Sequence, residues 1–256
     1  GSLSLMDYEE RRAPFLPLIP DVRHIEFNRK ESLSAITGKT AAVVLETIQG
    51  GAGIILPKNG YLAAVRKRCD ETGTLLILDE IQPGFGRTGK LFAFEHFDCV
   101  PDILVIGKGM ASGLPIGAFV ASKELMALLN SSPELGHITT FGGNAVIAAA
   151  AKMTLKVLLR DKLMDSIPDK EVLFRKLLQH ELIREIRGSG LMLCLVMPSA
   201  EVTSKLIHAC AEEGLILFWL LLDNKAVRLT PPLTITEEEI KKGCQIILEK
   251  LGQIVQ

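Results

Sequence analysis

The sequence predicts an α/β fold in which a mostly parallel β-sheet forms a large domain and a smaller α+β domain follows it. Two short runs rich in Leu, Ile and Val, residues 75–78 and 103–106, lead to this prediction because they are apolar without alternation. Such runs are typical of parallel strands that are buried on both faces. A segment with helical spacing, residues 58–72, separates the first run from an earlier apolar run at 41–48, as a parallel crossover requires.

The rest of the large domain is predicted from turn residues and spacing. A strand over residues 117–122 should run antiparallel to its predecessor, because the connection between the two is too short for a parallel crossover. Prolines near the start of the chain argue against a long helix there. The other expected elements are an irregular start (1–28), a loop with a short helix (83–97), a short helix (123–129) and a long alanine-rich helix (145–160).

The character of the sequence changes inside the long helix, so we place a domain boundary near Leu155. Residues 1–155 then form the large domain and residues 156–256 the small one. Thr236 and Glu239 have the spacing of a capping box at the start of the last helix. In the small domain we expect helices over 169–180, 200–213 and 237–253, a strand pair or one bent strand over 183–197, and strands over 215–222 and 226–230.

Composition and charge limit the class of function. The chain has 256 residues, with 29 basic against 30 acidic side chains and a net charge of −1. There is no basic stripe with interleaved aromatic residues, which argues against a nucleic-acid partner. The apolar stretches are far shorter than the ~20 residues that a membrane span needs. The five cysteines are scattered without a C-x-x-C pair, which favours a reduced, cytoplasmic setting and no metal site.

Polar side chains follow both apolar runs at the points where the strands should end. Asp79 and Glu80 follow the first run, and Lys108, between Gly107 and Gly109, follows the second. Ligands collect beyond the carboxyl ends of parallel strands, so the acid and the amine should face one crevice. A carboxylate can keep a pyridine nitrogen protonated, and a partly desolvated amine can attack a carbonyl. The pair therefore suits a cofactor with a basic ring nitrogen and an aldehyde.

These residues also have simpler interpretations. Lys108 could be a solvated loop residue, and the acidic pair could be a plain polar strand end. Ile81 and Gln82, which follow, could lie against a ring face and hydrogen-bond a ring hydroxyl. Two nucleotide-binding interpretations fail on spacing, because a Rossmann fingerprint lacks its third glycine and a phosphate loop would have Leu33 in place of its first.

Five separated blocks resemble the class III pyridoxal-phosphate aminotransferases, and within that class the acetylornithine/ornithine branch. The resemblance covers essentially the whole chain and implies the type I fold of pyridoxal-phosphate-dependent transferases. It also implies pyridoxal 5′-phosphate as cofactor and a homodimer with shared active sites. The blocks are ETIQG (46–50), LLILDEIQPGFGRTGKLFAFEH (75–96), PDILVIGKGMASGLPIGA (101–118), TTFGGN (139–144) and RLTPPL (228–233).

The resemblance implies a role for individual residues. Lys108 resembles the lysine that forms the internal aldimine and later moves the proton between the substrate carbon and the cofactor. Asp79 resembles the acid that pairs with the pyridine nitrogen. Ile81 resembles the residue packed on the ring face, and Gln82 the residue near the 3′ oxygen. Thr140 resembles a threonine that reaches the cofactor phosphate of the neighbouring subunit.

Glu46 and Arg228 resemble a gate pair in which a glutamate masks an arginine. The mask would let one pocket accept first an amine-bearing substrate and then a dicarboxylate oxo acid. The simpler interpretation is an ordinary structural ion pair. Departures from the family pattern loosen the substrate assignment: Thr47 stands for proline, Gly51 for glutamate, Pro83 for threonine and Ala111-Ser112 for a glycine pair.

By this resemblance the chain is an aminotransferase that moves an amino group from a donor such as acetylornithine or ornithine to 2-oxoglutarate. The first residues resemble the segment just after an H-G-R-T motif, which implies that roughly the first third of the family's length precedes them. That part should carry the phosphate cup, a stacking aromatic and an arginine for the substrate α-carboxylate. A catalytically incomplete chain with a dimerising or structural role is therefore one alternative. Another is a related activity, such as 4-aminobutyrate or diamine transamination, or racemisation.

Overall fold

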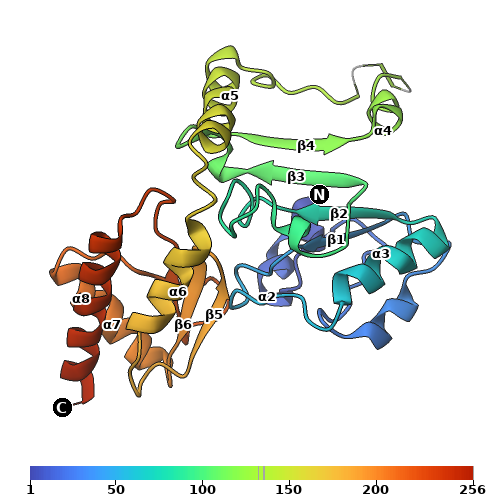
Figure 1. Cartoon of the computed structure of the whole chain (residues 1–256). Helices are drawn as coiled ribbons and strands as arrows, with labels where there is room; N and C mark the ends of the chain where they lie inside the picture. The colour runs from blue at the N-terminus through green and yellow to red at the C-terminus, as the bar shows by residue number, and fades with distance from the viewer. Residues whose placement is uncertain (132, 135, 256) are drawn as a thin grey trace.

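The chain folds around two β-sheets in a computed structural model that describes residues 1–131, 133–134 and 136–255. The first sheet has the strand order β1-β2-β3-β4 and the second has the order β5-β6-β8-β7. Figure 1 shows the second sheet with α6, α7 and α8 on the opposite side of the molecule from α3. Helix α5 (Ala145–Arg160) lies between the two sheets in the sequence. The predicted α/β architecture is confirmed.

The first sheet contains three parallel strands and one antiparallel strand. In the parallel part Glu46 pairs with Asp79, and Asp79 pairs with Val105, so the carboxyl ends of these strands lie at one edge. The antiparallel direction predicted for the last strand is confirmed. The strands are β1 (Ala42–Glu46), β2 (Leu75–Asp79), β3 (Ile103–Gly107) and β4 (Gly117–Ala121).

One face of this sheet is covered by helix α3 (Tyr61–Thr72) and the 3₁₀ helix η2 (Lys30–Ala35). Leu76 and Leu78 of β2 are fully buried in this contact. The other face is only partly covered: Val44 of β1 is 41% exposed, and its neighbour Ile77 of β2 is partly exposed. The prediction that these strands are buried on both faces is therefore wrong for the described residues, because α3 packs on one side only.

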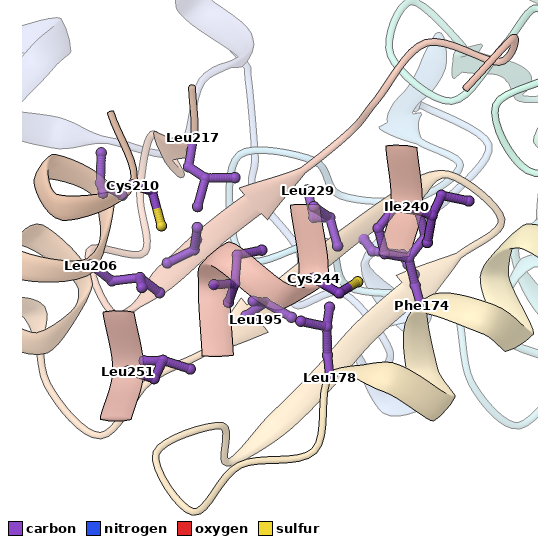
Figure 2. Close-up of a cluster of buried hydrophobic side chains, with 14 of the residues drawn as sticks. Phe174, Leu178, Leu195, Leu206, Cys210, Leu217, Leu229, Ile240, Cys244 and Leu251 are labelled. Atoms are coloured by element: carbon purple, nitrogen blue, oxygen red, sulfur yellow. The ribbon is translucent and has the colours of Figure 1, made fainter. Parts of the chain in front are cut away.

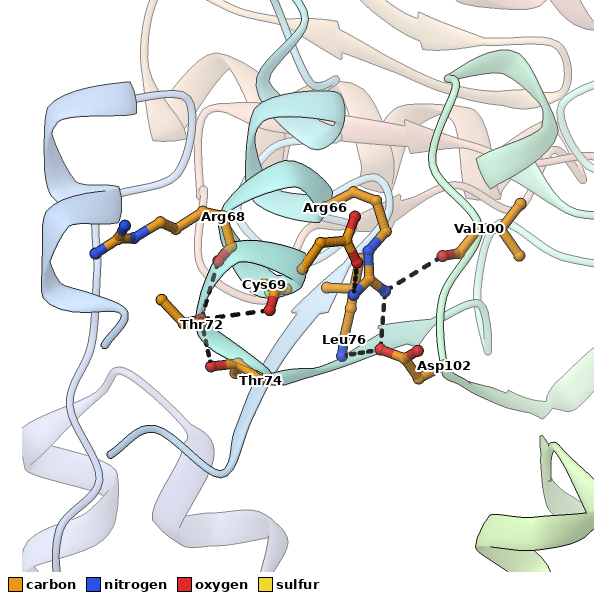
Figure 3. A network of polar contacts seen from close by, with 9 residues as sticks. Arg66, Arg68, Cys69, Thr72, Thr74, Leu76, Val100 and Asp102 are labelled. Carbon is orange, nitrogen blue, oxygen red and sulfur yellow. Dashed lines mark hydrogen bonds and ion pairs between the residues drawn. The ribbon is translucent and has the colours of Figure 1, made fainter. Parts of the chain in front are cut away.

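Asp102 joins β2, β3 and α3 at the amino ends of the strands (Figure 3). Its carboxylate accepts the Leu76 N–H at 2.7 Å and the Arg66 guanidinium at 2.8 Å, and its own N–H donates to the Leu76 carbonyl at 2.9 Å. Helix α3 ends as predicted at Gly73, whose φ of 67° is the left-handed conformation of a helix C-cap.

The second sheet is antiparallel throughout. The strand pair predicted over 183–197 is confirmed as a hairpin. The strand predicted over 215–222 is mostly wrong, because only Phe218 and Trp219 pair with β8 in this outer position. The strands are β5 (Glu185–Ser189), β6 (Met192–Val196), β7 (Phe218–Trp219) and β8 (Ala226–Leu229).

Helices α6 (Ile167–Leu177), α7 (Ala200–Glu212) and α8 (Glu237–Val255) enclose a large apolar cluster against this sheet. Figure 2 shows Leu195 and Leu229 of the sheet among side chains of these helices. The predicted capping box of α8 is confirmed: the Glu239 N–H donates to Thr236 Oγ1 at 3.2 Å, and the Thr236 N–H donates to the Glu239 carboxylate at 2.8 Å.

The remaining elements are short. The boundary predicted near Leu155 falls inside the continuous helix α5 and stays a prediction. Among the described residues, none of the helices combines the length and the apolar character needed to cross a bilayer. The short elements are α1 (Ser2–Leu5), α2 (Glu9–Arg12), η1 (Ala13–Phe15), η3 (Ala93–His96), η4 (Lys108–Ala111) and α4 (Lys123–Ala127).

Candidate active site

Three charged side chains lie at the carboxyl ends of the parallel strands. Glu46 is the last residue of β1, Asp79 is the last residue of β2, and Lys108 directly follows Gly107 at the end of β3. The register places Glu46 and Asp79 side by side in neighbouring strands. The structure thus brings the acid and the amine of the sequence analysis to the same edge of one sheet.

Glu46 responds to the charges of both neighbours. Its pKa is raised above the ordinary value, chiefly by burial, and the Asp79 carboxylate raises it further. Two interactions act in the opposite direction: a hydrogen bond of 2.8 Å from the Gly50 N–H, and the attraction of the Lys108 ammonium. Glu46, Asp79 and Lys108 therefore form one electrostatic group.

Lys108 has an unusual backbone and an unpaired amine. Its φ of 41° lies in the left-handed region, which non-glycine residues adopt rarely and which is often found at functional sites. Its side chain is exposed and forms no ion pair or hydrogen bond with any residue that the structure describes. The described chain therefore does not supply the desolvation that an attacking amine needs.

The surroundings of Asp79 fit a flat ring with a basic nitrogen. Asp79 Oδ1 accepts the Ile81 N–H at 2.8 Å, while Oδ2 accepts no hydrogen bond within the described ranges and is free for a ligand. The Ile81 methyl group lies 3.6 Å from the position that a Cβ on Gly107 would take. A Cβ on Gly50 would lie 1.9 Å from Gln82 Oε1, so the Gln82 amide needs a glycine there. Together with the amine of Lys108, the Asp79 carboxylate, the Ile81 side chain and the Gln82 amide suit a pyridine ring that carries an aldehyde.

Glu80 is a buried residue that the sequence analysis treated only as part of a polar strand end. Its carboxylate accepts hydrogen bonds from the Thr47 hydroxyl at 2.6 Å, the Phe94 N–H at 2.8 Å and the Ala93 N–H at 2.9 Å. Burial raises the pKa of Glu80. Strand alternation was the signal for this burial, because Leu78 and Glu80 are two residues apart and face the same side.

The structure does not join Glu46 to Arg228. Arg228 alternates with the buried Val227 and Leu229 of β8, so it points to the other face of the second sheet. Its guanidinium lies 5.3 Å from the centre of the Phe218 ring. Among the described residues no ion pair involves Arg228, and the Glu46 carboxylate binds a backbone amide instead. The structure therefore provides no ion pair for the predicted gate.

Thr140 lies apart from these residues in the sequence, in the segment before α5. Its side chain is exposed, and within the described part of the chain it forms no hydrogen bond with the other site residues. The structure thus places Thr140 on the surface beside an apolar helix and not in the crevice of its own chain.

Arg87 connects the loop after β2 to the second sheet, a role that no sequence signal indicated. Its guanidinium donates to the carbonyls of Leu191 and Pro231, and the Leu191 N–H donates to the Arg87 carbonyl at 2.8 Å. Burial lowers the pKa of Arg87. The backbones approach so closely that a Cβ on Gly190 would lie 2.5 Å from the Arg87 carbonyl oxygen. The loop that carries the site is thereby fixed to both sheets.

Comparison with known proteins decides the family. A family profile described as aminotransferase class-III matches residues 5–251. The chain belongs to the class III aminotransferases. Among solved structures, the ornithine aminotransferase of Toxoplasma gondii, crystallised with partial occupancy of pyridoxal phosphate at its active site, superposes with a TM-score of 0.91 at 31% identity. That superposition covers 99% of this chain and 61% of the T. gondii chain.

Two further aminotransferases have similar structures. The ornithine δ-aminotransferase of Plasmodium falciparum has a TM-score of 0.82 at 30% identity, over 93% of this chain and 63% of that chain. The N-acetylornithine aminotransferase of Stenotrophomonas maltophilia K279a has a TM-score of 0.79 at 31% identity, over 91% of this chain and 62% of that chain. The class III aminotransferase described here thus spans less than two thirds of each, and the family and the T. gondii structure point to pyridoxal phosphate as its cofactor.

Proposed function

We propose that this class III aminotransferase moves an amino group from ornithine, acetylornithine or a similar amine donor to 2-oxoglutarate. The observation that carries the proposal is that Asp79 and Lys108 lie at the ends of adjacent strands, where one Asp79 carboxylate oxygen and the Lys108 amine have no partner among the described residues. The donor class is supported by the similarity to ornithine and N-acetylornithine aminotransferases. Five free, buried cysteines support a reduced, cytoplasmic setting.

Each site residue has a chemical task in this proposal. Lys108 would hold pyridoxal phosphate by its aldehyde, and Asp79 would hold a proton on the ring nitrogen. The bound cofactor supplies an electron sink for the bond that breaks at the substrate carbon. The released amine of Lys108 then removes and returns the proton at that carbon. Ile81 would bind the ring face and Gln82 the 3′ oxygen.

Glu46 and Arg228 would control which substrate carboxylate is accepted. The Arg228 guanidinium carries a charge that no described carboxylate neutralises, so it can bind the second carboxylate of a dicarboxylate oxo acid. Glu46 lies in the same electrostatic group as Lys108. Movement of its carboxylate from the Gly50 amide towards Arg228 would mask the guanidinium while an amine donor is bound.

A homodimer with shared active sites is part of the proposal. Phe141 is 82% exposed and Val146 is 72% exposed, which leaves apolar surface along the start of α5. Large exposed apolar patches mark protein–protein interfaces. Thr140 lies directly before this surface, where it could reach the cofactor phosphate of a neighbouring subunit. The same contact would desolvate the exposed amine of Lys108.

Cofactor binding tests the proposal directly. The purified chain, mixed with pyridoxal phosphate and then freed of unbound cofactor, should retain a cofactor-derived absorbance band, and reduction with borohydride should leave the cofactor covalently on Lys108. Lys108→Ala should abolish both signals, whereas a matched change at the exposed Lys90, Lys90→Ala, should leave both intact. A band and an adduct that persist in Lys108→Ala would rule out the proposed role.

A second candidate is a dimerising or structural role without catalysis. It is favoured by the 61% share of the T. gondii chain that this chain spans. Stoichiometric binding of the cofactor by the purified chain would exclude it. An amine-donor panel with ornithine, acetylornithine, 4-aminobutyrate and a diamine then separates the related activities, and a chiral assay tests racemisation.

A further inference from the structure

A buried hydrogen-bonded pair lies directly behind the acidic residues of the site. Thr47 follows Glu46 at the end of β1, and Glu80 follows Asp79 at the end of β2. Both Thr47 and Glu80 are 0% exposed, and the Thr47 hydroxyl donates to the Glu80 carboxylate at 2.6 Å. The Thr47 N–H also donates to the Asp79 carbonyl at 3.4 Å. The N–H bond is the last rung of the ladder between β1 and β2, and the side-chain bond between Thr47 and Glu80 adds a contact outside that ladder.

The same carboxylate holds a third segment. The N–H groups of Ala93 and Phe94 at the start of η3 donate to Glu80 at 2.9 and 2.8 Å. No ion pair with Glu80 exists within the described residues, so these three donors are what compensates the burial of its charge. A buried carboxylate keeps a single position only while its donors remain in place, because each lost donor leaves an unsatisfied lone pair. Removal of one donor should loosen all three segments.

Strand alternation separates this pair from the crevice itself. The Glu80 side chain lies on the face of β2 that α3 covers, together with Leu78, whereas Asp79 lies on the opposite face. Glu80 thus acts on a ligand only through the backbone positions of its neighbours.

We propose that Thr47 and Glu80 are positioning residues that hold Glu46 and Asp79 at a fixed separation in front of Lys108. This inference rests on the proposed function, because the positioned carboxylate of Asp79 is the one that binds the cofactor ring nitrogen. Loss of the Thr47 hydroxyl lets the ends of β1 and β2 move apart. The Asp79 carboxylate then binds the cofactor ring nitrogen in a poorer geometry and more weakly.

Thr74 provides a matched control. It is also buried, at 3% exposed, and its hydroxyl donates to the Thr40 carbonyl at 3.1 Å, but it lies just before the amino end of β2. Thr47→Val and Thr74→Val therefore delete the same chemical group at opposite ends of two neighbouring strands, the carboxyl end of β1 and the amino end of β2. We expect Thr47→Val to weaken pyridoxal phosphate binding about tenfold in an absorbance titration, as loss of one buried hydrogen bond to a charged group implies. Thr74→Val should bind as the wild type does, and Thr47→Ser should restore binding.

Hydrogen exchange without cofactor separates failure of this inference from failure of the proposed function. The Ile81 and Gly50 amides donate to Asp79 and Glu46, so their exchange reports on both carboxylates. We expect exchange of both amides to be about tenfold faster in Thr47→Val and unchanged in Thr74→Val. A wild-type chain that binds no cofactor would end the proposed function, while this exchange comparison would still decide the positioning role. Equal exchange in the two valine variants, or no rescue by Thr47→Ser, would overturn it. Should Thr47→Val not fold, Thr47→Ala replaces it with the same expected results.

Discussion

Three carboxylates at the ends of two neighbouring strands differ in chemistry because their surroundings differ. Glu80 is enclosed and accepts three hydrogen bonds, Asp79 keeps one oxygen that no described donor binds, and Glu46 interacts with the charges of both Asp79 and Lys108. Asp79 and Glu80 are consecutive residues, yet the carboxylate of Asp79 can reach a ligand whereas that of Glu80 is buried and binds neighbouring segments. Thr47, which departs from the family pattern, supplies one of the donors to that support.

Charge changes around Glu46 should move its pKa in opposite directions. Lys108→Met removes an attraction that lowers the pKa of Glu46, so that pKa should rise further. Asp79→Asn removes a repulsion and should lower it. Carboxyl ¹³C titration by NMR on the cofactor-free protein measures both changes, with Lys90→Met as a control that should change nothing. The same direction of change in both variants would contradict the proposed electrostatic group.

Glu80 should make the protein less stable as the pH rises. Its pKa is raised in the folded state by burial from the ordinary 4.5, so below that pH both states hold the proton and the stability is fully present. Between the ordinary and the raised pKa the folded state keeps a proton that the unfolded state releases, and the free energy of unfolding falls by at most about 1.4 kcal/mol per pH unit. Urea unfolding of the wild type and Glu80→Gln over this range measures the difference. Identical slopes would show that the pKa of Glu80 is unchanged by folding.

At the scale of the element, one arginine of α3 forms two ion pairs, one that connects the helix to the sheet and one on the surface of the helix. Arg66 binds Asp102 at 2.8 Å and also Asp70 of its own helix at 2.7 Å. Asp102 in addition accepts the Leu76 N–H and so connects the start of β2 to the residue just before β3. The Asp70 side chain is 64% exposed, against 33% for Asp102. The contact with Asp102 therefore fixes the register of β2 against β3, and with it the position of Asp79 at the end of β2.

Replacement of the two aspartates should therefore have unequal effects. Asp102→Ala should lower the free energy of unfolding by about 1.5–3 kcal/mol, because a charged acceptor is lost from a backbone N–H and a half-buried guanidinium. Asp70→Ala should lower it by less than about 1 kcal/mol, as is usual for an exposed ion pair. Urea denaturation of both variants measures the two values. A larger effect for Asp70→Ala would remove Asp102 from its proposed part in the register.

At the scale of the whole molecule, two cores must act as one unit for the site to have a defined shape. A small apolar cluster joins them, in which Ile48 and Ile54 from the first part of the chain pack against Met192 and Cys194 of β6. Arg87 adds a polar contact between the same two parts. The loop after β2, which begins at the residues that follow Asp79, is therefore held against the second sheet.

Loss of the Arg87 contact should uncouple the two parts. Arg87→Met removes the bonds to Leu191 and Pro231, so we expect separate unfolding transitions and a loss of about 1.5–3 kcal/mol. Arg175→Met is the matched control, because Arg175 donates to the Ile186 and Gly188 carbonyls within the second part alone. Arg175→Met should lower the free energy of unfolding of the protein and leave a single unfolding transition. Calorimetry distinguishes the two outcomes, and a single sharp transition in Arg87→Met would argue against this role for Arg87.

Local rules accounted for much of the fold and part of the site. Apolar runs and crossover lengths identified β1 to β4 and the direction of β4. Cap residues identified where α3 ends and where α8 begins. These features depend on neighbours in the sequence. The extent of β7 was wrong, since pairing with β8 limits it. The full burial of the strands was also wrong, because α3 covers one face only. No local signal indicated the contact of Arg87 with Leu191, which is distant in the sequence.

The amino-acid sequence by itself determined which chemical groups stand at the strand ends, an acid at 79 and an amine at 108, because strand length and chain direction are local properties. Only the tertiary structure decided that Glu46 binds a backbone amide and not Arg228, that Glu80 is enclosed, and that the amine of Lys108 is open to solvent. Burial and charge interactions depend on which segments meet in space, and a linear pattern does not contain that information.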